Sequence, residues 1–328
     1  MTKKIQVLCT LGPSSLNKKF LNFTNNKVSL LRLNMSHIKL KKLKHHINFI
    51  KKNTSTPICI DTEGAQIRTK INKKEKFKIN QIFKIHKLNE KIMLYPPDVF
   101  NKLKINDALD IGFNDLTAKI ISKNKKYLSL KTTSSGTLEN NKGVHIKNRL
   151  IKLNYLTKKD FEAIKVAKKF KIKNFALSFT NTVEDIKKFN EILPKQNKIF
   201  KIESKQAVKN IGKFFKLANN FLIDRGDLSK SIKIENVPVA QRKIIKISKK
   251  YRGKNVFIAT NFLETMIHNQ TPTRAEANDI YNSLEMGAKG LVLAAETAIG
   301  KFPDKAVIFL NKMIKIYRSK KKFNFFNN

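Results

Sequence analysis

The chain has 328 residues, which is enough for an α/β barrel of about 250 residues and one inserted module. Hydrophobic residues make up 41% of the chain in short runs, far from the ~20 consecutive apolar residues that a membrane span needs. The formal charge of +44 comes mostly from lysines spread from end to end, whereas a nucleic-acid surface usually clusters its cations. We therefore expect neither a membrane nor a nucleic-acid partner, but a surface that attracts small phosphorylated anions.

The first residues and the two cysteines bear on cellular location. Met1-Thr2-Lys3-Lys4 leads directly into the strand-like run that starts at Ile5, without an apolar signal segment. Cys9 and Cys59 each lie inside such an apolar run, which is typical of a buried, inert thiol rather than a disulfide or a metal ligand. We expect a cytoplasmic protein.

Eight short runs rich in Val, Ile, Leu and Phe recur along the chain, and most are followed by a helical pattern. This alternation predicts a (β/α)8 TIM barrel. The last run precedes a single helix, expected over residues 304–317, and we expect no C-terminal regulatory domain. The runs cover residues 5–10, 28–34, 57–61, 174–179, 198–203, 220–224, 255–260 and 290–294.

The stretch between the third and fourth runs has a different pattern. Polar and apolar residues alternate, as in Lys76-Phe77-Lys78-Ile79, and turn signals occur at residues 95–97 and 134–136. This predicts a small antiparallel β-barrel domain at residues 70–146, inserted between barrel segments 1–69 and 147–328. Because barrel enzymes place their sites at the carboxyl ends of the strands, such an insertion is expected to act as a lid.

The strongest candidate site lies at the ends of the fifth and sixth runs. Lys201 and Glu203 share one face of their predicted strand, because side chains alternate with a period of two. If that face points into the barrel mouth, Glu203 and Asp227 offer two carboxylates to a hard divalent cation such as Mg²⁺. The alternative is a structural Lys201–Glu203 ion pair with Asp227 capping a helix.

A second group of polar residues lies at and just after the ends of the second and third runs. Arg32, Asn34 and Ser36 alternate, and Arg68 follows the third run; Asp61 and Thr62 end that run. Arginine binds phosphate with two parallel hydrogen bonds, and the oxygen-bearing side chains suit a second, monovalent cation. The alternative is a hydrogen-bonded network on the surface.

A further motif, at residues 271–276, could also be a site. Thr273 and Glu276, three residues apart, fit a capping box that starts a helix, and we prefer that structural interpretation.

Taken together, these segments resemble the pyruvate kinase family, and the resemblance runs in order along nearly the whole chain. The motifs that carry it are Cys9-Thr10-Leu11-Gly12-Pro13-Ser14-Ser15, Arg32-Leu33-Asn34-Met35-Ser36-His37, Asp61 to Arg68, Lys142-Gly143-Val144, Lys201-Ile202-Glu203, Arg225-Gly226-Asp227-Leu228, Ala259-Thr260-Asn261, Leu263-Glu264, Pro272 to Glu276 and Glu296-Thr297-Ala298. So many ordered matches make a chance resemblance implausible.

The resemblance implies phosphoryl transfer from phosphoenolpyruvate to ADP, which gives pyruvate and ATP in glycolysis. It implies that Lys201, Arg32 and Thr260 are catalytic, that Glu203 and Asp227 hold Mg²⁺ or Mn²⁺, and that K⁺ is bound. The implied K⁺ ligands are Asn34, Ser36, Asp61 and Thr62. The implied substrate contacts are Lys201, Gly226, Asp227, Thr260 and Arg68, and the implied nucleotide contacts are Asn34, His37, Arg68 and Lys142. A homo-oligomer formed through the barrel is compatible with this resemblance.

Several positions depart from the family pattern. Asp110-Ile111-Gly112 keeps one of two usual aspartates in the inserted domain, and Glu63, Ala65 and Gln66 replace the usual Lys, Pro and Glu. Ser229-Lys230-Ser231 replaces a Gly-Val-Glu stretch beside Asp227. Two alternatives therefore stay open: a barrel paralogue with an altered substrate or nucleotide, and a catalytically degenerate protein that binds an anion or a partner.

Overall fold

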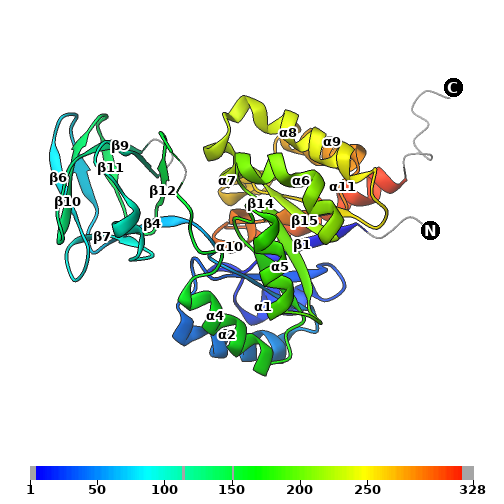
Figure 1. The fold of residues 1–328 in the computed structure, drawn as a ribbon. Coiled ribbons are helices and arrows are strands. Elements are labelled where there is room, and N and C mark those ends of the chain that lie inside the picture. Colours follow the sequence, from blue (N-terminus) through cyan, green and yellow to red (C-terminus); the bar gives the residue numbers. More distant parts are fainter. Residues whose placement is uncertain (1–4, 113–114, 150, 320–328) are drawn as a thin grey trace. The chain divides into compact units, whose positions relative to one another are not determined.

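The computed structural model describes residues 5–112, 115–149 and 151–319. The chain divides into two compact units, one formed by the residues up to Glu63 together with those from Lys158 onward, and one formed by Gly64–Thr157. Figure 1 colours the chain along the sequence, so the second unit is found in cyan to green. The predicted insertion, residues 70–146, lies within this second unit.

The first unit is built on eight parallel strands that close into a barrel in the order β1-β17-β16-β15-β14-β13-β3-β2. Each strand begins and ends within two residues of its predicted run, so the predicted TIM barrel is confirmed. The strands are β1 (Gln6–Thr10), β2 (Leu30–Asn34), β3 (Ile58–Asp61), β13 (Asn174–Leu177), β14 (Asn197–Ile202), β15 (Asn220–Asp224), β16 (Asn255–Ala259) and β17 (Gly290–Leu293).

Helices form a layer outside these strands (Figure 1). Side-chain caps start several of them: Asn17, Thr182, Ser204 and Thr273 each accept a hydrogen bond from a backbone amide three residues on. The predicted capping box of Thr273 with Glu276 is confirmed. The helices are α1 (Lys18–Thr24), α2 (Leu40–Asn53), α4 (Lys158–Lys169), α5 (Val183–Ile192), α6 (Lys205–Leu217), α7 (Arg225–Ser231), η1 (Ile234–Asn236), α8 (Val237–Ser248), η2 (Glu264–Ile267), α9 (Arg274–Met286), α10 (Ala295–Ala298) and α11 (Pro303–Arg318).

The barrel has asparagines at the amino ends of four strands and an apolar layer further along the strands. Four consecutive strands begin with asparagine: Asn174, Asn197, Asn220 and Asn255. Asn197 Nδ2 donates to Asn174 Oδ1 at 3.1 Å, and Asn255 Nδ2 donates to Asn220 Oδ1 at 2.8 Å. Asn174 donates to the Ile58 carbonyl on β3, and Asn220 donates to the Lys198 carbonyl on β14. These neutral bonds tie adjacent strands together where the barrel begins. The apolar layer above contains Leu8, Leu30, Cys59, Ala176, Ile199, Leu222, Phe257, Ala259 and Val292.

The second unit is also a closed barrel, with seven strands in the order β10-β6-β7-β4-β12-β8-β9 and a separate pair of β11 and β5. Its neighbours pair antiparallel, as predicted, except that β6 and β7 pair parallel through His86 and Met93. The elements are β4 (Ile67–Ile71), β5 (Glu75–Phe77), β6 (Ile82–His86), β7 (Ile92–Tyr95), α3 (Val99–Lys102), β8 (Ala108–Ile111), β9 (Leu116–Lys123), β10 (Tyr127–Thr132), β11 (Gly136–Leu138) and β12 (Gly143–Ile146).

Both cysteines are free and fully buried, as predicted. Burial raises the pKa of the Cys9 and Cys59 thiols well above the ordinary value, so neither thiol is activated for chemistry. Among the described helices, none combines the length and the hydrophobicity that crossing a membrane requires.

Candidate active site

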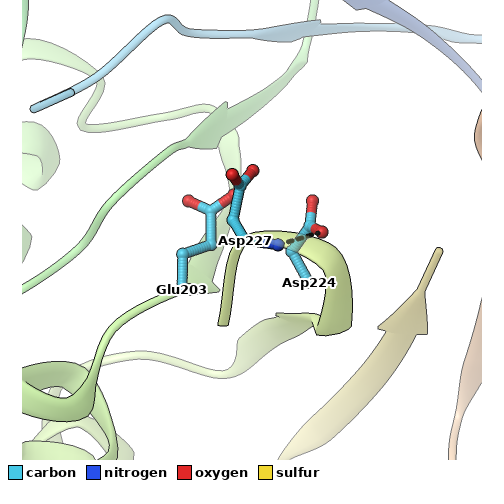
Figure 2. Close-up of side chains that lie close together, drawn as sticks. All are labelled: Glu203, Asp224 and Asp227. Atoms are coloured by element: carbon cyan, nitrogen blue, oxygen red, sulfur yellow. Dashed lines mark hydrogen bonds between the residues drawn. The ribbon is translucent and has the colours of Figure 1, made fainter. Parts of the chain in front are cut away.

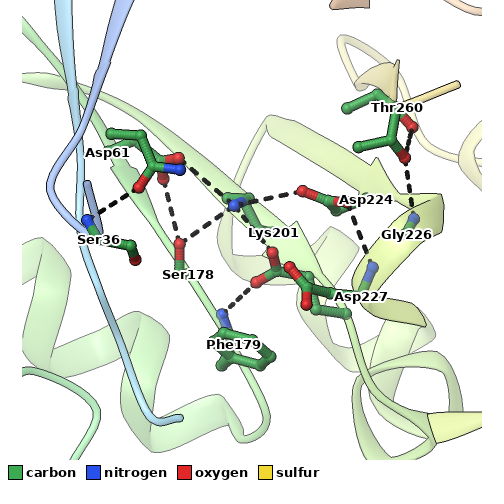
Figure 3. A network of polar contacts seen from close by, with 12 residues as sticks. Ser36, Asp61, Ser178, Phe179, Lys201, Asp224, Gly226, Asp227 and Thr260 are labelled. Carbon is green, nitrogen blue, oxygen red and sulfur yellow. Dashed lines mark hydrogen bonds and ion pairs between the residues drawn. The ribbon is translucent and has the colours of Figure 1, made fainter. Parts of the chain in front are cut away.

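The centre of the site is the Lys201 ammonium at the end of β14. Its side chain is only 4% exposed. Nζ lies 2.8 Å from Glu203 Oε1, 3.4 Å from Asp61 Oδ2 and 3.5 Å from Asp224 Oδ2 (Figure 3). Burial disfavours the charged form of Lys201, but these three carboxylates outweigh it and raise the pKa of Lys201. The side chain is therefore a buried, permanent cation.

Arg32 on β2 supplies a second buried cation. Arg32 and Asp61 lie on the adjacent strands β2 and β3, and Arg32 Nε lies 3.1 Å from Asp61 Oδ2. Burial opposes the charge of Arg32, and Asp61 followed by Asp224 more than compensates and raises its pKa. Arg32 Nη1 is buried without a hydrogen-bond partner among the described residues. A buried guanidinium nitrogen without an acceptor is expected to gain from an anionic ligand.

Three carboxylates converge beside Lys201. Glu203, Asp224 and Asp227 each present an oxygen atom, and these three atoms lie within 4.8 Å of one another (Figure 2). Burial, together with the charges of Asp227 and Asp224, outweighs the attraction of Lys201 and raises the pKa of Glu203 to about 8. Such crowded carboxylates suit a hard divalent cation, which prefers oxygen ligands and would offset their mutual repulsion.

The sequence interpretation missed Asp224 as a member of this cluster. Asp224 ends β15 and starts α7, where its Oδ1 accepts a hydrogen bond from the Asp227 amide at 3.4 Å. The structural alternative, in which Asp227 caps the helix, is therefore wrong, because Asp224 is the cap. The Lys201–Glu203 ion pair that this alternative also named is present, but it is part of the convergent cluster rather than an isolated pair.

Two residues at the end of β13 also belong to the site and were not predicted. Ser178 Oγ donates to Asp61 Oδ1 at 3.1 Å and lies 3.2 Å from Lys201 Nζ. The Phe179 amide donates to Glu203 Oε2 at 2.5 Å (Figure 3), and Phe179 has a left-handed φ of 51°. A backbone amide carries no residue-type signal, so the sequence offered no way to find this contact.

Thr260 follows β16 in a left-handed conformation, with a φ of 74°. Its Oγ1 accepts a hydrogen bond from the Gly226 amide at 2.9 Å, and Arg225 Nε and Nη2 both donate to its carbonyl oxygen. Arg225 is itself fixed by two hydrogen bonds to Asp279. Gly226 and Asp227 are two of the implied substrate contacts, and in this structure their backbone amides both donate to oxygens of the protein.

The four predicted monovalent-cation ligands lie at the ends of β2 and β3. Asn34 and Asp61 are register partners, and Asn34 Oδ1 accepts a hydrogen bond from the Ser36 amide at 3.0 Å. Asp61 and Thr62 are buried, so the alternative of a surface network is wrong for these two. Since the Asp61 carboxylate already contacts Arg32, Lys201 and Ser178, the fit to a monovalent cation is weaker than the fit of the acidic cluster to a divalent one.

Three further predicted residues are His37, Arg68 and Lys142. His37 is exposed, and its amide donates to Asn34 O at 3.1 Å. Arg68 and Lys142 belong to the second unit, where Arg68 Nη1 donates to Asn141 O at 3.3 Å. Lys142 Nζ lies 3.2 Å from Glu139 and 3.3 Å from Asp115. Burial opposes the charge of Lys142, but hydrogen bonds to these two carboxylates raise its pKa.

Fold and site together define a (β/α)8 barrel with a charged cluster at the carboxyl ends of its strands, where barrel enzymes place their chemistry. The family model for the pyruvate kinase barrel domain matches residues 2–307. The chain belongs to the pyruvate kinase family.

Individual relatives agree with this assignment. The chain is 32% identical to a pyruvate kinase of Thermotoga maritima, with 99% of this chain and 72% of the relative covered. It is 33% identical to a pyruvate kinase of Methanocaldococcus jannaschii, with 96% of this chain and 70% of the relative covered. Against a pyruvate kinase of Staphylococcus epidermidis the identity is 30%, and the chain spans 55% of that protein's length.

Proposed function

We propose that this chain transfers a phosphoryl group between phosphoenolpyruvate and ADP, forming pyruvate and ATP in glycolysis, in the cytoplasm. One observation carries the proposal: three convergent carboxylates lie beside two buried cations, Lys201 and Arg32. Phosphoryl transfer depends on positioning and on charge neutralisation, with little covalent work for the protein. Membership in the pyruvate kinase family supplies the reaction that this arrangement suits.

The proposed divalent cation is Mg²⁺ or Mn²⁺, held by Glu203 and Asp227, with Asp224 as an additional oxygen donor. The fit rests on the three carboxylate oxygens within 4.8 Å of one another. Burial, together with the charges of Asp227 and Asp224, raises the pKa of Glu203, and a bound cation would offset both effects. When bound, such a cation would neutralise charge on the phosphoryl oxygens of the substrate.

The two buried cations of the chain are proposed to bind the phosphoryl group. Arg32 has a guanidinium nitrogen without an acceptor among the described residues, and Lys201 is a point charge fixed by three carboxylates. Together they would hold the phosphoryl oxygens and offset their charge as the bond to the substrate oxygen weakens. Thr260, whose hydroxyl holds the Gly226 amide, is proposed to lie near the carbon that takes up a proton.

Further contacts are proposed by family resemblance alone. Arg68 is the proposed second phosphate contact, and His37, Asn34 and Lys142 are proposed nucleotide contacts. K⁺ is proposed to bind near Asn34, Ser36, Asp61 and Thr62. Asp61 is already paired with two cations of the chain, Arg32 and Lys201, so its carboxylate would contribute less to K⁺ binding than the other three residues.

The deciding experiment measures pyruvate formed from phosphoenolpyruvate and ADP by the purified chain, with Mg²⁺ present and K⁺ varied. We expect turnover in the wild type, its loss in Lys201→Ala, and no change in Lys216→Ala, which removes an exposed lysine of α6. Folded wild-type protein without turnover would contradict the proposal. A panel of other phosphorylated substrates and nucleotides would then test an altered specificity.

A further inference from the structure

Lys230 places a second ammonium against the acidic cluster. It lies three residues after Asp227 on α7, so both side chains project from the same face of the helix. Lys230 Nζ contacts Asp227 Oδ1. The side chains are only 10% and 22% exposed, respectively, so this ion pair is not a loose surface contact.

Each carboxylate of the cluster therefore contacts a lysine. Lys201 contacts Glu203 and Asp224, and Lys230 contacts Asp227. The two lysines differ in mobility: Lys201 is on a barrel strand and is enclosed by its partners, whereas Lys230 is in the last turn of a short helix. A flexible four-carbon stem lets an ammonium at such a position leave its partner when a stronger cation arrives.

We propose that Lys230 is a tethered competitor for the divalent cation at Asp227. In the absence of metal, its ammonium stabilises the crowded carboxylates. A divalent ion that uses the same Asp227 oxygen must displace the Lys230 ammonium. After displacement the ammonium stays tethered a few ångström away and repels the bound ion. Lys230 thereby raises the metal concentration that the site requires. This inference rests on the metal site of the proposed function.

The test compares Lys230→Met, which keeps side-chain length but removes the charge and adds no oxygen ligand, with the wild type. Lys216→Met, on the exposed face of α6, removes the same charge away from the cluster. Lys230→Arg keeps the charge. Binding of Mn²⁺ to each purified 328-residue chain is measured by electron paramagnetic resonance, and thermal unfolding is followed with and without Mn²⁺.

We expect Lys230→Met to bind Mn²⁺ about tenfold more tightly, which corresponds to ~1.4 kcal/mol. Its metal-free form is expected to melt at a lower temperature than the wild type, and its stabilisation by saturating Mn²⁺ is expected to be larger. Lys216→Met and Lys230→Arg should bind Mn²⁺ like the wild type. The opposite signs of the two melting effects distinguish competition from a general loss of folding.

Equal Mn²⁺ affinity in Lys230→Met and the wild type would overturn the role of Lys230 and leave the proposed function intact. An equal gain of affinity in Lys216→Met would also overturn it, because net charge alone would then explain the effect. Absence of Mn²⁺ binding in all four folded proteins would remove the metal site, and with it both the inference and the proposed function.

Discussion

The two ends of the first barrel are built from the same strands but handle polarity in opposite ways. At the amino end, Asn174, Asn197, Asn220 and Asn255 exchange neutral hydrogen bonds between adjacent strands. At the carboxyl end, charged side chains are crowded together, and five of them, Arg32, Asp61, Lys201, Glu203 and Asp224, are less than 10% exposed. Arg32 Nη1 has no hydrogen-bond partner among the described residues. The hydrogen bonds of the amino end stabilise the fold, whereas the carboxyl end holds crowded charges whose interactions a bound ligand would complete.

The largest effect is expected at the carboxyl end, from Glu203→Gln. This change removes one carboxylate of the cluster without changing the side-chain shape, and turnover in the pyruvate assay should fall by about 10³-fold, or ~4 kcal/mol. Metal-free stability should behave differently. Folding raises the pKa of Glu203 to about 8, so ionisation of Glu203 destabilises the folded state. The loss of unfolding free energy grows as the pH rises from the pKa of the unfolded glutamate toward about 8.

Urea unfolding in a chelator at several pH values checks that second part. Glu203→Gln should lack the alkaline loss of stability, so it should be at least as stable as the wild type at pH 8. A variant that is inactive and also much less stable at that pH would contradict the view that the carboxyl end trades stability for ligand binding.

Asp107 is a buried carboxylate whose hydrogen bonds are satisfied within the protein, in contrast to the charges at the carboxyl end of the first barrel. Asp107, in the second unit, accepts hydrogen bonds from Arg149 Nε at 2.6 Å, Arg149 Nη2 at 2.7 Å and the Lys104 amide at 2.8 Å. Burial alone would raise the pKa of Asp107, but these partners outweigh it and lower that pKa. Asp107→Asn should cost ~2 kcal/mol of unfolding free energy at neutral pH.

The sign of this pH dependence follows from the lowered pKa. The stabilisation is present above the unfolded pKa of an aspartate and is lost as the pH falls through the lower, folded value. Wild type and Asp107→Asn should therefore converge in urea titrations as the pH falls below the unfolded pKa. Lys104→Ala keeps the amide donor but removes a side-chain charge that also lowers the pKa of Asp107, so it should show a smaller loss of stability than Asp107→Asn. A difference that stays constant with pH would show that the hydrogen-bond geometry matters more than the charge.

Asp224→Asn distinguishes a cap from a metal ligand. Asparagine still offers an oxygen to the Asp227 amide and remains a good helix cap, but it removes one charge from the cluster. Mn²⁺ affinity should fall about tenfold, or ~1.4 kcal/mol, with little change in melting temperature without metal. Unchanged affinity would restrict Asp224 to the role of a cap.

The smallest effect is expected at the amino end. Asn220→Ala removes the acceptor of Asn255 Nδ2 and the donor to Lys198 O, which should cost ~1 kcal/mol of stability and leave the activity per folded molecule unchanged. Asn219→Ala, one residue earlier, is the matched control. Loss of turnover in Asn220→Ala at full folding would show that the two ends are coupled.

The fold could be predicted because eight apolar runs and their intervening helical patterns are local signals, and each strand was found within two residues of its run. Lys201 and Glu203 followed from strand periodicity. The cap at Asp224 did not, because Asp224 ends the sixth run, Asp227 follows three residues later, and their spacing does not show which carboxylate caps the helix. The contact of Phe179 with Glu203 is made by a backbone amide, which every residue except proline possesses.

One connection in the first barrel has a consequence for folding. Strands β3 and β13 are hydrogen-bonded neighbours, yet the whole second unit lies between them in the chain. Joining two strands across so long a loop is entropically unfavourable and slows folding. Within the second unit, however, β4 and β12 pair through Arg68 and Gly143, so its early folding would bring the two entry points of the chain together. The folded inserted unit would then shorten the effective loop between β3 and β13 and speed closure of the first barrel.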